Sequence, residues 1–253
     1  MQITKLIDIK NKLKQIDIGM EPIIFLHSSM FQLGRLENGI PGLMNVIFEW
    51  LGPNSTLLMP SFSYHNRIDL PWCANDTKAK TGVLTEHFRK INGVRRSIHP
   101  IHSVTAYGKH AEFFVSDIES TSFGPKSSFA KLITVNAMNV SLGANFIGGA
   151  TFLHYAEEYL KSPYRAFIDL GVRCLDSNNS VVPCEFKYFA RRSINNLEYK
   201  NSWRTPLQDL VGNNLFVFDK INSANLMHAK MGDTIKFMIE QMQKNPFYCA
   251  ENI

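Results

Sequence analysis

The sequence predicts an α/β protein that forms a single compact unit. A largely buried central sheet is expected, flanked by helices, with an antiparallel accessory region in the C-terminal third. Short apolar runs that end in polar turns, helical patterns between them, and a change of pattern after Arg165 predict this class. The 253 residues, with 45% hydrophobic and 19% charged side chains, suit one globular domain over residues 1–253.

Three apolar runs predict the strands of the central sheet. They cover residues 21–29 (EPIIFLHSS), 55–61 (STLLMPS) and 138–142 (MNVSL). The first run does not alternate between apolar and polar residues, which is typical of strands that are buried on both faces of a parallel sheet, and we interpret the other two as strands of the same kind. The runs therefore predict a sheet that is covered by helices on both sides.

Helical spacing of apolar residues appears between these runs. Residues 3–16 place aliphatic side chains between lysines, which predicts an amphipathic helix that covers one edge of the core and ends before Gly19. Residues 42–50 and 84–89 predict two further helices. Residues 231–243 predict a closing helix, because Asn245-Pro246 follows it.

The region after Arg165 has a different pattern. Residues 166–173 and 181–188 read as strands, and the turn cluster Asp176-Ser-Asn-Asn separates them. We therefore expect an antiparallel hairpin in the C-terminal third.

Charge and composition exclude several classes of protein. The chain has 27 Lys and Arg against 22 Asp and Glu, a net charge of +5, which permits an anionic ligand but does not require nucleic acid. Its longest apolar runs are far too short to cross a membrane. The first 15 residues contain no apolar signal segment, so we expect a cytoplasmic protein. The four cysteines form no Cys-x-x-Cys pair, which disfavours a metal site.

Three polar loops follow the predicted strands. They are residues 27–29, 61–64 and 143–151. Ligands of α/β sheets bind where strands run out into loops, and small residues there leave backbone N–H groups open to a phosphate or an oxyanion. Residues 143–149 contain no GxGxxG pattern, which excludes a dinucleotide fingerprint.

The most informative segment begins at Thr151, which can cap a helix. Its histidine, His154, then lies in the first turn, where the positive helix end disfavours the imidazolium and keeps the ring neutral, as a general base requires. The alternative is a surface histidine on a solvated stripe. The pattern places Phe152, Ala156, Tyr159 and Leu160 on the apolar face and His154, Glu157, Glu158 and Lys161 on the opposite face.

A second dense segment, residues 95–103 (RRSIHPIHS), combines arginines, histidines and serines around a proline. It could bind phosphate or hold a catalytic loop, and a solvated loop is the alternative. A metal site built from His99 and His102 is disfavoured, because no carboxylate or third histidine is near in sequence.

Six blocks in this order are similar to the aminoglycoside 3-N-acetyltransferase family. They are HSSMFQLG, TLLMPSFSY, TGVLTEHFR, RSIHPIHSVTAYG, FGPKSSFAKL and NVSLGANFIGGATFLHYAEEYLKSPYR. The similarity covers Leu6 to Arg165 well and the C-terminal third loosely. It implies an acetyl-CoA-dependent N-acyltransferase without a metal, with an α/β fold particular to that family.

The resemblance also implies roles for individual residues. The LHYAE block places the catalytic histidine at His154, with Glu198 as its carboxylate partner and Asp209 as the alternative. The cofactor residues implied are Ser28, Ser29, Ser61, Arg96, Ser97, His99 and Ser103. The acceptor residues are Tyr64, Asp69 and Glu157.

The acceptor is expected to be a small-molecule amine on an amino sugar. Because a net charge of +5 repels a polycationic aminoglycoside, we expect a nucleotide-linked amino sugar of surface polysaccharide synthesis. A true aminoglycoside 3-N-acetyltransferase and a non-catalytic sugar-binding relative are the alternatives. A hydrolase with Ser28 or Ser29 as nucleophile lacks the Gly-x-Ser-x-Gly elbow. The oligomeric state stays open, with a homodimer as one alternative.

Overall fold

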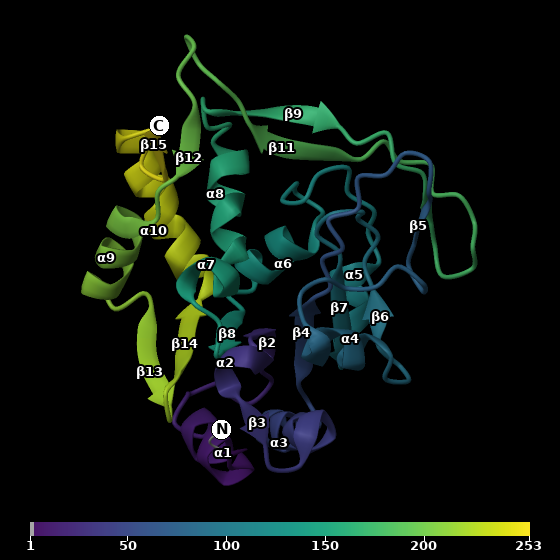
Figure 1. The fold of residues 1–253 in the computed structure, drawn as a ribbon, viewed down its shortest axis with the longest axis vertical. Coiled ribbons are helices and arrows are strands. Elements are labelled where there is room, and N and C mark those ends of the chain that lie inside the picture. The colour runs from purple at the N-terminus through teal and green to yellow at the C-terminus, as the bar shows by residue number, and fades with distance from the viewer. Residues whose placement is uncertain (1–2) are drawn as a thin grey trace.

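A seven-stranded sheet forms the centre of the protein in a computed structural model that describes residues 3–253 (Figure 1). Its strand order is β13-β14-β8-β2-β4-β7-β6. The strands are β2 (Ile23–Ser28), β4 (Thr56–Pro60), β6 (Arg95–Arg96), β7 (Val104–Gly108), β8 (Met138–Leu142), β13 (Val217–Ile221) and β14 (Ala224–Lys230).

The three predicted strands lie side by side in the middle of this sheet. β2 pairs in parallel with β4 on one side and with β8 on the other. All other neighbours are antiparallel, at both rims. The expected parallel sheet is therefore correct for its buried centre, and antiparallel strands extend it on either side.

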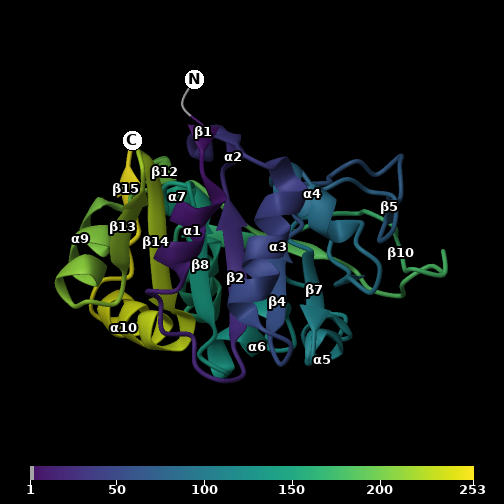
Figure 2. The same ribbon diagram turned by 90° about the horizontal axis from the view of Figure 1, so that it is seen from below.

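Helices cover both faces of the sheet, and its central strands β4 and β8 are buried along their whole length. Ile24 and Leu26 pack with α1 (Leu6–Leu13), α3 (Gly39–Leu51) and α4 (Val83–Arg89). Figure 2 shows α1 and α3 on the near face of the sheet. Phe25, which points the other way, packs in a second core. That core includes residues of α5 (Ala111–Val115), α6 (Ser128–Thr134), α8 (His154–Tyr159) and α10 (Met231–Lys244).

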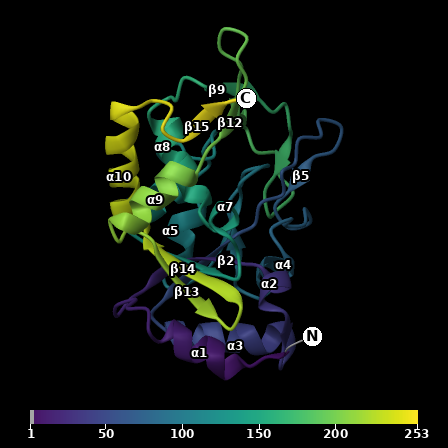
Figure 3. The same ribbon diagram turned by 60° about the vertical axis from the view of Figure 1, so that its left-hand side comes forward.

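Short paired strands surround this three-layer body. β1 (Ile3–Thr4) pairs with β3 (Arg35–Leu36) and β5 (Trp72–Cys73) with β10 (Cys174–Leu175), both in parallel. β9 (Arg165–Asp169) pairs with β11 (Lys187–Arg191) and β12 (Tyr199–Asn201) with β15 (Ala250–Asn252), both antiparallel (Figure 3). The remaining helices are α2 (Met30–Leu33), α7 (Phe146–Gly149), the 3₁₀ turn η1 (Thr151–Leu153) and α9 (Arg204–Gly212).

The C-terminal third differs in detail from the expectation. The antiparallel accessory pair exists, but it joins residues 165–169 to 187–191, while residues 174–175 pair with β5 instead. The sequence pattern also missed α9 and the β13–β14 hairpin. That hairpin turns tightly at Asn222, whose φ of 56° is left-handed, and adds two strands to the central sheet.

Within residues 3–253, no helix combines the length and the apolar character that a membrane span requires.

Candidate active site

A cleft of about 810 Å³ opens where the parallel strands end. β2 ends at Ser28 and β8 at Leu142, and the backbone N–H of Ser29 donates to the carbonyl of Leu142 at 2.8 Å. Gly143 follows with a φ of +84°, and a Cβ there would lie 2.7 Å from the carbonyl oxygen of Ser29. This close approach of two backbones requires glycine and fixes the shape of the cleft.

The cleft is lined by both polar and apolar residues and carries a positive charge. Ser28 and Ser29 line it, as expected, with the 143–148 loop and Asn145 opposite. The exposed Lys80 is the one charged lining side chain among the described residues, since burial lowers the pKa of His27 to about 4 and leaves that ring neutral. Such a cleft suits a polyanionic ligand.

A smaller cavity of about 230 Å³ continues from this cleft. Both are lined by Tyr64, Ile147 and Thr151, so these residues form the passage between them. Tyr64 thus lies at the boundary of the two spaces, and its contact with the acceptor stays a prediction. The cavity also contains His154 and Glu157.

His154 is the first residue of α8 and follows directly on η1. Its side chain keeps 30% of its surface exposed, and its Nδ1 is hydrogen-bonded to Oε2 of Glu157, three residues later. A carboxylate only accepts hydrogen bonds, so Nδ1 carries the proton and Nε2 is left as the basic nitrogen. This is the tautomer that a general base in the cavity needs.

Glu157 is fully buried, and its second oxygen has three donors. Oε1 accepts from the Tyr164 hydroxyl at 2.7 Å, Arg165 Nε at 3.0 Å and Asn201 Nδ2 at 3.2 Å. Burial by itself would raise the pKa of Glu157. The charges of His154 and Arg165 and the hydrogen bonds of His154 and Tyr164 outweigh it, so the pKa of Glu157 lies below its ordinary value.

The expectation that Glu198 is the partner of His154 is therefore wrong. Glu198 is exposed just before β12, and its backbone carbonyl pairs with Ile253. Asp209, the alternative, accepts a hydrogen bond from the Tyr248 hydroxyl at 2.6 Å. The partner lies one helical turn from the histidine instead, where i and i+3 side chains meet.

The predicted polar face of this helix also needs correction. Glu157 has no exposed surface and Glu158 only 7%, because α8 lies between the sheet and the β9–β11 pair. Tyr159, expected on the apolar face, is 61% exposed. Thr151 begins the 3₁₀ turn rather than capping α8, and its side chain makes no capping hydrogen bond.

Three of the expected cofactor residues support the fold instead. The carbonyl oxygen of Ser61 accepts from Arg96 Nη2 at 2.8 Å and from the Ser103 hydroxyl at 2.7 Å. The Arg96 guanidinium lies over the ring of Trp72, 4.9 Å from its centroid, and burial lowers the pKa of Arg96 to about 9. Ser61 and Ser103 are fully buried. The Arg96 and Ser103 side chains thus bind the protein's own backbone at Ser61.

Ser97, His99 and Asp69 have similar local roles. The Ser97 hydroxyl accepts from the Val104 N–H at 2.8 Å, and His99 is buried beneath the same loop. Asp69 forms an ion pair with Arg67 at the surface and lies outside both cavities. The segment 95–103 is thus a supporting loop that contributes one side chain, His102, to the inner cavity.

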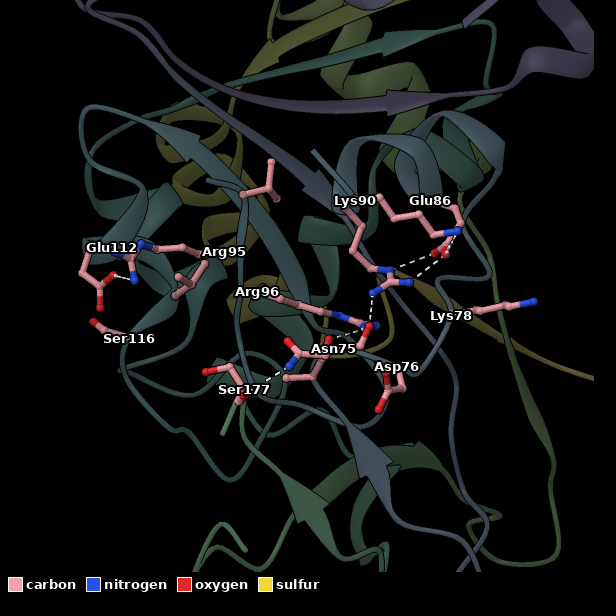
Figure 4. A pocket seen from close by; sticks show the side chains of 14 residues that line it. Asn75, Asp76, Lys78, Glu86, Lys90, Arg95, Arg96, Glu112, Ser116 and Ser177 are labelled. Carbon is pink, nitrogen blue, oxygen red and sulfur yellow. Dashed lines mark hydrogen bonds and ion pairs between the residues drawn. The ribbon is translucent and has the colours of Figure 1, made fainter. Parts of the chain in front are cut away.

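A separate cleft of about 720 Å³ lies beside α4, and Arg96 forms part of its wall (Figure 4). Its strongest charges neutralise each other. Arg89 pairs with Glu86 at 2.7 Å, and Arg95 pairs with Glu112 at the same distance. Ligand charges would have to break these pairs, so this cleft is a poor candidate for the functional site.

Sequence reasoning missed the residues that hold Glu157. Tyr164 and Arg165 stood at the end of the last family-like block, and Asn201 lies on β12, far away along the chain. The spacing of three between His154 and Glu157 was the signal that could have identified the pair.

Comparison with known proteins agrees with this fold. The sequence profile of the aminoglycoside 3-N-acetyltransferase family matches residues 25–243, so the chain belongs to that family. It is 30% identical over 152 residues to the aminoglycoside N(3)-acetyltransferase IV of Salmonella sp.. That alignment covers 59% of this chain and 58% of the relative, so the chain matches little more than half the length of this relative.

Solved structures share the fold over nearly the whole chain. AAC-IIIb in a binary complex with CoASH gives a TM-score of 0.81 at 19% identity, covering 96% of this chain and 97% of that one. AAC-VIa bound to sisomicin gives 0.79 at 20% identity, covering 96% and 98%. The expected family fold is therefore confirmed.

Proposed function

We propose that this protein is an acetyl-CoA-dependent N-acetyltransferase that modifies the 3-amino group of an aminoglycoside. The observation that carries this proposal is the His154–Glu157 pair at the inner end of a cleft with a positive charge, in a chain of this family. The pair supplies a base, and the cleft suits the phosphates of CoA.

The larger cleft binds one substrate, and the inner cavity binds the other. CoA occupies the larger cleft, with Ser28, Ser29 and Lys80 along its phosphates, and its thioester reaches past Tyr64 into the inner cavity. The inner cavity, at about 230 Å³, takes the reacting ring of the acceptor, and the other rings lie toward its mouth.

The chemistry follows from the tautomer of His154. The amine nitrogen attacks the thioester carbon and loses a proton to Nε2 of His154. Glu157, whose negative charge is maintained by Arg165, stabilises the imidazolium that forms. The C–S bond then breaks, and the CoA thiolate takes the proton back from the imidazolium. No acyl-enzyme is needed, and His154 has hydrogen bonds to Glu157 but to no serine among the described residues.

The family relatives favour an aminoglycoside over the nucleotide-linked amino sugar that net charge suggested. AAC-VIa was solved with sisomicin, and the Salmonella relative is named for aminoglycoside acetylation. A nucleotide-linked acceptor has no comparable support. Net charge is a weak guide here because the long-range field of +5 is screened within ~10 Å at 0.1 M salt.

The test is a substrate panel. Purified protein and acetyl-CoA are mixed with sisomicin, gentamicin, kanamycin and apramycin, and in parallel with nucleotide-linked amino sugars, while CoA release is followed with a thiol reagent. We expect a kcat/KM above ~10⁴ M⁻¹s⁻¹ for at least one aminoglycoside. NMR of that product should show the acetyl group on the 3-amino nitrogen. Turnover of nucleotide-linked sugars alone would contradict the proposal.

His154→Ala is the matched control for the panel. Loss of a general base costs ~10²–10⁴-fold in turnover, while acetyl-CoA binding, measured by calorimetry, should persist. Activity within a few-fold of the unmodified protein would exclude His154 as the base.

A further inference from the structure

The inner cavity contains a second histidine that the proton transfer does not use. His102 is about nine-tenths buried and lines the cavity together with His154. Its Nδ1 lies 2.7 Å from the hydroxyl oxygen of Ser122. Nε2 is therefore the ring nitrogen that remains for a group in the cavity.

The protonation of this ring is set by a neighbour, His99. Nδ1 of His99 accepts two backbone N–H groups, those of Ile101 and His102, each at 3.1 Å. A nitrogen that accepts two donors carries no hydrogen. Burial lowers the pKa of His99 to about 3, so the ring is neutral and its one hydrogen is on Nε2.

Ser122 connects His99 to His102 by hydrogen bonds, so the tautomer of His99 determines that of His102. Nε2 of His99 lies 3.5 Å from the Ser122 oxygen and is the donor of that pair. Among the described residues the Ser122 hydroxyl has no other acceptor within hydrogen-bond distance, so its hydrogen is directed at Nδ1 of His102, which accepts it. Burial above all, with the positive charge of Arg165, holds the pKa of His102 well below its ordinary value. The neutral ring consequently has its hydrogen on Nε2.

The ring of His102 is also fixed in orientation. Four aromatic rings surround it, with centroid distances between 4.8 and 6.0 Å. They belong to Phe62, Tyr64, Phe123 and Tyr188. A fixed ring with a fixed tautomer is a preorganised hydrogen-bond donor.

We propose that Nε2–H of His102 donates a hydrogen bond to the thioester carbonyl oxygen during acetyl transfer, and that Ser122 and His99 act as positioning residues that fix its tautomer. This inference rests on the proposed function. As the N–C bond forms, the carbonyl π pair moves onto oxygen, where this donor stabilises it. The pair returns when the C–S bond breaks. His102 keeps its proton throughout, and His154 alone carries a proton between amine and thiolate.

Two substitutions of His102 distinguish a hydrogen-bond donor at Nε2 from a side chain that only packs in the cavity wall. His102→Asn keeps a polar group near the Nδ1 position but removes the donor at Nε2, whereas His102→Gln places an amide N–H near Nε2. We expect His102→Asn to lower kcat by ~10²–10³-fold, the typical cost of one oxyanion donor, and His102→Gln to recover at least ~10-fold of that loss. The acceptor KM should stay within ~3-fold. His87→Asn, an exposed histidine on α4, is the control, and thermal unfolding checks that each variant is folded.

Several results would overturn the proposal. They are an unchanged kcat in His102→Asn, equal losses in the two His102 variants, or a rise in acceptor KM at constant kcat, since the last would mean that His102 holds the acceptor instead.

A measurement independent of activity completes the test. In ¹⁵N-histidine-labelled protein, long-range ¹H–¹⁵N spectra distinguish the two neutral tautomers. We expect His102 with its hydrogen on Nε2, and a mixture of tautomers in Ser122→Ala. A hydrogen on Nδ1 in the unmodified protein would refute the assignment of the donor. If no amine is acetylated by the unmodified protein, the proposed function fails, and this spectrum still decides the tautomer.

Discussion

Glu157 binds Nδ1 of His154 through one carboxylate oxygen and is held through the other by Tyr164, Arg165 and Asn201. His154 is thus positioned by the buried carboxylate of Glu157, whose negative charge is balanced by Arg165. Removal of any member of this group should therefore affect both catalysis and folding.

Glu157→Gln should lower turnover by ~10²–10⁴-fold, because a neutral amide keeps the volume but cannot stabilise the imidazolium of His154. Steady-state CoA release measures the effect. Glu198→Gln, at the exposed carboxyl that the sequence had suggested, is the control and should change kcat by less than about two-fold. The reverse result would restore the sequence-based assignment.

Arg165→Met should destabilise the protein by ~3–5 kcal/mol, because it leaves Glu157 buried without its counter-charge. Urea unfolding at pH 7 gives the change in the free energy of unfolding. Arg192→Met removes an exposed arginine that donates to the Pro163 carbonyl, and it should cost less than ~1 kcal/mol. Equal effects of the two substitutions would mean that the buried Arg165–Glu157 pair is no more important for stability than an exposed arginine.

Glu158→Gln should change how stability depends on pH. Burial raises the pKa of Glu158 from its ordinary 4.5 to about 7. Between these values the folded state keeps a proton that the unfolded state has lost, so this group's contribution to stability is lost as the pH rises from 4.5 to 7. At pH 8 the glutamine variant should be more stable than the unmodified protein by roughly 3 kcal/mol, and at pH 4 the difference should vanish.

The control for this prediction is Glu185→Gln, since that side chain is exposed. Its effect on the unfolding free energy should be the same at both pH values. A Glu158→Gln effect that does not vary with pH would show that this carboxyl titrates normally.

Gly143→Ala should destabilise the protein and weaken CoA binding. Its φ of +84° disfavours any side chain, and the added Cβ would lie 2.7 Å from a backbone oxygen at the edge of the cleft. We expect a loss of ~1–3 kcal/mol in unfolding and at least a ~10-fold higher Kd for CoA by calorimetry. Gly212→Ala, in open space at the end of α9, should stabilise by up to ~1 kcal/mol without changing this Kd. Unchanged CoA affinity in Gly143→Ala would mean that the 143–148 loop does not bind the cofactor.

The central fold could be predicted from the sequence because its signals are local. The runs at 23–28, 56–60 and 138–142 are short and rich in apolar residues, and such strands are typically buried between two layers of helices. Helix α10 could be predicted equally well. The spacing of its apolar residues indicates the buried face, and Asn245-Pro246 indicates where the helix ends. The polar loops at Ser28-Ser29 and Gly143 were located by the same logic.

Tertiary structure alone decided which polar side chains are buried and which residues they pair with. The sequence shows Glu157 and Glu158 as the solvated face of an amphipathic helix. Both are buried in the structure. Glu157 accepts hydrogen bonds from Tyr164, Arg165 and Asn201, and Glu158 accepts one from Thr121, so the donors lie up to 44 positions away along the chain. The cofactor role predicted for the RSIHPIHS block could not be checked from the sequence for the same reason. Its arginine and serines bind backbone carbonyls and amides of neighbouring segments, and no local pattern indicates such contacts. The sequence shows that a charged residue is present. Which residues pair with that charge, and therefore what chemistry it can perform, depends on contacts between segments that are distant along the chain.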